Sequence, residues 1–171
     1  DELLDEVGAD SARLTFLLQS MDSRQTFDID VVTSTANDNP VFYVQYANAR
    51  IHSIGRKAAD RGITRVPLDE ADLSVLSHPR ETEILRVLFG LQELVPAACA
   101  ERAPHRIATW ARELASAFHG FYHDCPVLSD DVPEPVRQAR LWLVEAALVG
   151  ITIAADVLGV SLPDRMERDE S

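Results

Sequence analysis

The chain has 171 residues, of which 46% are apolar and 26% charged, a composition typical of a globular domain and not of a disordered segment. This length accommodates one ordinary domain and excludes a multidomain enzyme. Sixteen basic and 28 acidic residues give a net charge of −12, which argues against a protein that coats nucleic acid or an anionic membrane through its overall charge.

Helical periodicity runs through the first third of the chain. It predicts helices over residues 1–7, 11–20, 30–34 and 41–61. Asp10 is a suitable N-cap for the second of these helices. Proline favours a first helical turn, so Pro40 should open the long central helix, and Gly62 should follow it in the left-handed conformation.

The same periodicity continues to the other end of the chain. It predicts a short segment capped by Asp69 or Asp72, then helices that begin at Pro79, Pro104 and Val136, the last of them ending at Leu158 before Gly159. Pro96 should break or kink the helix that begins at Pro79. No alternating strand pattern persists, so the sequence predicts an all-α helical bundle.

The acidic total hides one basic stretch. Residues 41–66 carry five basic side chains and one acidic side chain, whereas residues 1–40 carry two basic and nine acidic ones. A solvated helix face that balances acidic neighbours would explain the stretch, and so would an anion-binding patch, because the local field matters more than the total charge at short range. The pattern leaves both interpretations open.

Three side-chain groups could in principle carry chemistry. His119 and His123 lie four residues apart near Cys125, a spacing that suits a shared metal ion, but no further ligands follow, so no metal site is expected. Cys125 would need His123 as a base to act as a nucleophile, and no orienting group accompanies the pair. The aspartate pairs Asp28/Asp30 and Asp130/Asp131 lie in polar stretches where aspartate serves caps and turns.

The central helix offers a different kind of site. Tyr43, Tyr46 and Arg50 follow one another at three- and four-residue spacing, so they project from one helical face. Two aromatic rings and a guanidinium can stack on unpaired bases and hold a phosphate, and Gln45 and Asn48 add hydrogen-bonding groups nearby. A buried stripe whose tyrosine hydroxyls bond to the backbone would give the same pattern.

The same helix resembles the one that opens the anticodon-binding core of class I arginyl-tRNA synthetases. Residues 39–54 read Asn-Pro-Val-Phe-Tyr-Val-Gln-Tyr-Ala-Asn-Ala-Arg-Ile-His-Ser-Ile. The segments 118–128 and 158–166 resemble the last helices and tail of that family in the right order, so the resemblance covers nearly the whole chain. Two positions depart from the family pattern. Asp10-Ser-Ala-Arg13 occupies the place of the family's Asp-Ala-Leu-Arg motif, and Asn48 occupies a position where the family commonly has histidine.

The resemblance implies an RNA-binding site and no catalytic residue. Carried over by position, its contacts with the anticodon loop are Tyr43, Gln45, Tyr46, Asn48, Arg50, Phe118, His119, Tyr122 and Met166. The implied partners are the tRNA for arginine and a catalytic domain of the same parent chain. We expect residues 1–20 to be the end of a linker with the first helices, and residues 21–171 to be the anticodon-binding bundle.

The resemblance also limits what this chain should do alone. The family's two ATP-binding signatures are absent from the sequence, so we expect no cofactor and no arginylation here, while the parent would use ATP with magnesium. With two cysteines and no signal peptide, the sequence favours a cytoplasmic protein that binds no membrane. The alternatives are a helical protein-interaction module without RNA binding and a small metal-dependent enzyme.

Overall fold

The computed structural model describes residues 7–20, 27–35 and 38–166. Its elements are α2 (Ala9–Leu17), α3 (Ile29–Thr33), α4 (Pro40–Asp60), the 3₁₀ turns η1 (Leu68–Glu70) and η2 (Leu73–Val75), α5 (Pro79–Glu101), α6 (His105–Asp124) and α7 (Glu134–Leu158). These ranges contain helices and no strand, so the predicted all-α bundle is confirmed. The predicted helix over 1–7 lies almost entirely outside the described residues.

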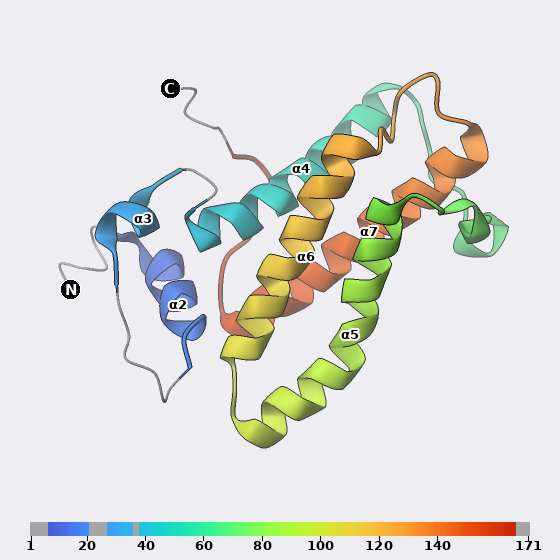
Figure 1. Ribbon diagram of the computed structural model, residues 1–171. Helices are drawn as coiled ribbons and strands as arrows, with labels where there is room; N and C mark the ends of the chain where they lie inside the picture. The colour runs from blue at the N-terminus through green and yellow to red at the C-terminus, as the bar shows by residue number, and fades with distance from the viewer. Residues whose placement is uncertain (1–6, 21–26, 36–37, 167–171) are drawn as a thin grey trace.

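The four long helices form the body of the molecule (Figure 1). α5 and α6 run antiparallel beside each other, and α4 and α7 both pack against α6. The buried faces of α6 supply much of the core, including Leu114, Phe118 and Phe121, none of which is exposed to solvent. α2 and α3 lie at one side, where α2 packs against α4.

Local sequence signals explain where the helices begin and end. Asn39 caps α4 by accepting from the backbone N–H groups of Val41 and Phe42, with Pro40 in the first turn as predicted. Gly62 and Gly159 follow α4 and α7 with φ of 67° and 66°, which is the left-handed conformation that glycine adopts most readily. The predicted bounds of the central helix are therefore confirmed.

Two predicted boundaries were wrong. Gly8, not Asp10, precedes α2, so Asp10 lies inside the first helical turn and its carboxylate is free to bond elsewhere in the molecule. α7 begins at Glu134, with Pro135 in its first turn, because proline is as suitable there as in α4.

α5 continues through Pro96 to Glu101 and changes direction along its second half (Figure 1), so the proline bends the helix and does not end it.

α7 has a mean hydropathy of 1.9 over its most apolar stretch and is long enough to cross a membrane. Half of that stretch is buried inside the bundle, against α5, α6 and α4. Burial on several sides explains the apolar composition of such a helix without a membrane.

A buried ion pair ties the start of α5 to α7. Glu81 is 1% exposed, and its carboxylate accepts from Arg140 Nε at 2.6 Å and from the backbone N–H of His78 at 2.8 Å. Arg140 also donates to the carbonyl of Pro126 at 2.7 Å, in the loop after α6. The pair therefore joins three parts of the bundle that are distant in sequence.

Candidate functional site

A pocket of about 380 Å³ lies between α4, the end of α6 and the segment that follows α7. We call it the Arg50 pocket. Its lining residues are Tyr46, Ala49, Arg50, Ser53, Arg56, Tyr122, Arg165 and Met166. Two aromatic rings, a thioether and three guanidinium groups thus line one recess, and no carboxylate side chain is among the lining residues.

The guanidinium of Arg50 lies between two tyrosine rings. Its central carbon is 4.4 Å from the ring centroid of Tyr46 and 4.6 Å from that of Tyr122. Such distances give cation–π attraction to both rings. Arg50 therefore holds two aromatic surfaces from different helices in a fixed relation before any ligand arrives.

His119 completes this arrangement from α6. Arg50 Nη1 lies 3.1 Å from His119 Nδ1, and His119 Nε2 lies 3.1 Å from the backbone carbonyl of Tyr43. Arginine is only a donor, so Nδ1 must accept and the neutral ring must carry its proton on Nε2, which donates to the carbonyl. His119 thus links Arg50 to the start of α4.

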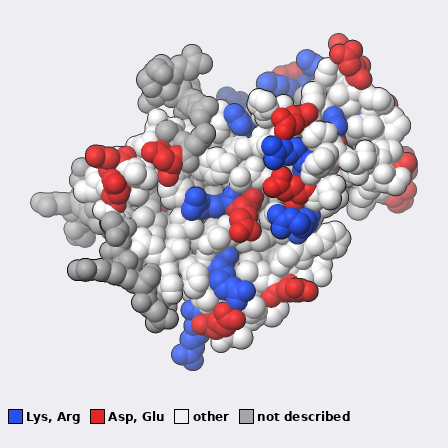
Figure 2. Space-filling model, viewed as in Figure 1, with Lys and Arg blue, Asp and Glu red and all other residues white. Residues whose placement is uncertain are grey.

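The pocket's positive lining contrasts with other surfaces of the acidic chain. Figure 2 shows acidic and basic side chains interleaved over the face that α5 and α6 present to the viewer, where charges of opposite sign neutralise one another. Within the Arg50 pocket Arg50, Arg56 and Arg165 meet no lining carboxylate. A local positive field of this kind attracts phosphate or the acceptor edge of a base.

The segment 159–166, called the tail below, forms one wall of the pocket, and α4 holds it in place. Gln45 Nε2 donates to the carbonyl of Ser161 at 2.9 Å, and Asn48 Nδ2 donates to that of Pro163 at 3.0 Å. Arg56 donates to the carbonyl of Asp164 at 3.2 Å. The tail therefore lies along α4, and Met166 at its end enters the pocket.

The structure brings four of the nine predicted RNA contacts together in the Arg50 pocket. These four are Tyr46, Arg50, Tyr122 and Met166. His119 bonds to Arg50 from the side, and the Tyr43 ring lies 4.5 Å from the His119 ring while lining a separate recess with Arg112. The two α4 tyrosines thus line different recesses, Tyr46 with Tyr122 and Met166, and Tyr43 with Arg112.

The remaining three predicted contacts occupy other positions. Phe118 is fully buried in the core, so no base can stack on it in this conformation. Asn48 is 1% exposed. The side-chain amides of Asn48 and Gln45 both donate hydrogen bonds to tail carbonyls. None of these three residues lines the pocket.

Sequence reasoning did not single out Arg56 or Arg165 as pocket residues. A signal was available in α4, where Gln45, Asn48, His52 and Arg56 recur at three- and four-residue spacing next to the Tyr46 stripe. All four bond to the tail: His52 Nε2 lies 3.2 Å from a carboxylate oxygen of Asp164, and the other three donate to tail carbonyls. Two adjacent stripes on one helix thus hold the tail and line the pocket.

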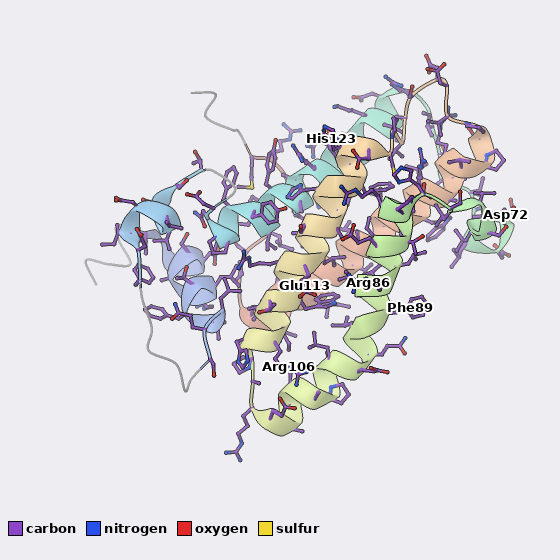
Figure 3. All side chains as sticks on the ribbon, in the orientation of Figure 1. Asp72, Arg86, Phe89, Arg106, Glu113 and His123 are labelled. Atoms are coloured by element: carbon purple, nitrogen blue, oxygen red, sulfur yellow. The ribbon has the colours of Figure 1, made fainter. Side chains whose placement is uncertain are left out.

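His123 and Asp28 bond to residues close to them in the sequence. Among the described residues no three His, Cys, Asp or Glu side chains are grouped so that they could hold a metal ion. His123 lies at the exposed end of α6 (Figure 3) and bonds to Asp124. The hydrogen bonds from His123 and Arg80 lower the pKa of the Asp124 carboxyl. Asp28 caps α3, as its place in a polar stretch suggested.

Cys125 is buried and lies beside a histidine that the sequence did not suggest. Its Sγ is 3.2 Å from Nδ1 of His78, whereas the Nδ1 of His123 bonds to Asp124. Burial raises the pKa of the Cys125 thiol, which lowers the fraction of the nucleophilic thiolate. The contact therefore joins the start of α5 to the end of α6.

Comparisons with known proteins identify one family and a set of similar proteins. The DALR anticodon binding domain family matches residues 44–166. The arginine–tRNA ligase of Moorella thermoacetica is 46% identical over 97% of this chain and 29% of its own length, and that of Frankia alni is 44% identical over 96% and 30%. The structure of Thermus thermophilus arginyl-tRNA synthetase superimposes with a TM-score of 0.78 at 30% identity, covering 94% of this chain and 27% of that one. The chain thus spans under a third of the length of these relatives.

Proposed function

Because the chain belongs to the DALR anticodon binding domain family, we propose that it binds the anticodon loop of a tRNA and that the Arg50 pocket receives an unpaired base of that loop. The observation that carries this proposal is the guanidinium of Arg50 between the rings of Tyr46 and Tyr122, in a pocket without a lining carboxylate. Stacking on aromatic rings suits single-stranded RNA, whose bases are unpaired and accessible.

Each part of the pocket has a separate role in this proposal. The tyrosine ring surfaces that Arg50 does not cover and the Met166 thioether offer apolar surface to a base, and stacking on an aromatic side chain contributes about 1–3 kcal/mol per base. Arg56 and Arg165 neutralise adjacent phosphates. Arg50 donates to an acceptor on the base edge, which discriminates among bases when a mismatch leaves a buried polar group unpaired.

We further propose that the parent protein is an arginine–tRNA ligase that works in the cytoplasm. The names of the relatives support this proposal, and its substrates would be arginine, ATP with magnesium, and the tRNA for arginine. In this proposal residues 1–20 lead from a catalytic domain of the same chain, and residues 21–171 form the anticodon-binding bundle. The 171-residue chain alone would bind tRNA without forming arginyl-tRNA.

Replacing Tyr122 with alanine tests the site. The variant should bind an anticodon stem-loop about 5- to 150-fold more weakly, because it loses one stacking surface and one of the two rings that hold Arg50. The change in Kd can be measured by fluorescence anisotropy. Phe89→Ala is the matched control, since Phe89 is 70% exposed on α5 and lies outside the pocket (Figure 3). Equal Kd values for wild type, Y122A and F89A would refute the proposed site.

The salt dependence of binding follows from the number of cations in the pocket. Three arginines line the pocket, so the chain neutralises at most about three phosphates. For single-stranded RNA, the slope of log K against log salt should therefore be no steeper than about −2. Titrations of the stem-loop between 50 and 200 mM salt would measure this slope. A slope that requires six or more phosphate contacts would show that the RNA follows a much larger surface.

A further inference from the structure

The carboxylate of Asp10, in the first turn of α2, bonds to the far end of the chain. Asp10 Oδ2 accepts from the backbone N–H of Ser161 at 3.1 Å and from the Ser161 hydroxyl. The same oxygen accepts from Gln45 Nε2 at 3.3 Å, while Gln45 also donates to the Ser161 carbonyl at 2.9 Å. One carboxylate thus joins α2, α4 and the tail, and we call the set Asp10, Gln45 and Ser161 the latch.

Arg13, one turn further along α2, reinforces the latch. Its guanidinium donates to the carbonyl of Gly159, and its side chain packs against the same glycine, which turns the chain out of α7 with φ of 66°. α2 therefore holds the tail at the point where it leaves α7. Beyond this point the tail runs along α4 to Arg165 and Met166.

The geometry points to Asp10 as a positioning residue for the Arg50 pocket. By fixing Ser161, it sets the path of the next five residues and so places Met166 and Arg165 in the pocket wall. This inference rests on the proposed function of the pocket and adds a dependence on α2: a displacement of α2 would release the tail at Ser161 and leave Asn48 and Arg56 to hold it along α4.

Methionine methyl resonances report the position of the tail without RNA. The chain has two methionines, Met21 and Met166, so ¹³C-methyl labelling of methionine gives two signals that M21L and M166L would assign. In the full chain the Met166 methyl should be shifted by the nearby rings of Tyr46 and Tyr122, with which it shares the pocket. In Asp10→Ala this signal should move part of the way to the value of an unstructured methionine, because Asn48 and Arg56 still bond to the tail.

Asp30→Ala is the matched control, because it removes the same charge from an exposed position on α3 and has no tail contact among the described bonds. Its Met166 signal should stay where it is in wild type. If Asp10→Ala failed to fold, Ser161→Ala would remove one latch bond from the tail side and should shift the same signal part of the way. An unchanged Met166 signal in a folded Asp10→Ala chain would overturn the inference.

A double-mutant cycle connects the latch to binding. Asp10→Ala should weaken stem-loop binding about 5- to 10-fold, and in a Met166→Ala background the same change should have a smaller effect, since Asp10 acts partly through Met166. Equal effects in both backgrounds would contradict this route. Failure of the proposed function would look different: wild type would not bind the stem-loop, while the Met166 signal would still respond to Asp10→Ala.

Discussion

Replacing Arg50 with alanine is expected to weaken anticodon stem-loop binding by about 2–3 kcal/mol, or about 30- to 150-fold, the largest single effect on binding. The side chain contacts the rings of Tyr46 and Tyr122 and bonds to His119. Its loss therefore removes a cation from the pocket and also the group that fixes both stacking surfaces. Fluorescence anisotropy with a labelled stem-loop would measure the change in Kd.

Two further variants separate geometry from charge. Arg50→Lys keeps the charge but loses the planar guanidinium that stacks between the rings, so it should recover only a small part of the lost affinity. Arg86→Ala removes one positive charge from an exposed position on α5 (Figure 3) and should change Kd little. Full recovery in R50K, or an equal loss in R86A, would mean that Arg50 contributes only its charge.

Replacing Arg140 with methionine is expected to lower the free energy of unfolding by about 3–5 kcal/mol, the largest single effect on stability. Glu81 is 1% exposed, and the substitution leaves its carboxylate buried with a backbone N–H as its remaining described partner. Urea denaturation followed by circular dichroism would measure the loss.

The effect of Glu81→Gln on the stability of Arg140→Met tests whether the unpaired charge of Glu81 causes the loss. Adding Glu81→Gln to Arg140→Met removes the uncompensated charge while an amide oxygen can still accept from the His78 N–H, so the double variant should be more stable than Arg140→Met alone. Arg106→Ala, which breaks an exposed pair with Glu101, should cost at most about 1 kcal/mol. A double variant less stable than the single one would show that the charge of Glu81 is not what destabilises R140M.

Much of the fold could be predicted because it depends on local signals. Pro40, Gly62 and Gly159 mark helix ends whose backbone conformation the residue type itself favours. Asp10 was assigned the wrong role because a good capping residue in sequence can be used by a distant partner in the fold. Ser161 is 151 residues away, and no local pattern reports that contact.

The candidate site could be predicted in part for the same reason. Tyr46 and Arg50 share one face of α4, which helical spacing determines, and the family resemblance added Tyr122 and Met166. Phe118 was grouped with them although it is fully buried in the core. It lies one helical turn before Tyr122 and so on the same face of α6, and its position along the helix places it in the core while Tyr122 reaches the pocket. Which turn of a helix its neighbours cover is set by packing across the bundle and is not encoded in spacing.

Titration of the chain with an anticodon stem-loop that carries a central cytosine, and with the same stem-loop in which that base is changed, tests the central claim most directly. We predict that the cytosine stem-loop binds more tightly by at least about fivefold, and that Arg50→Ala abolishes most of this difference. Equal affinities of the wild-type chain for the two stem-loops would contradict the claim that the Arg50 pocket recognises an anticodon base.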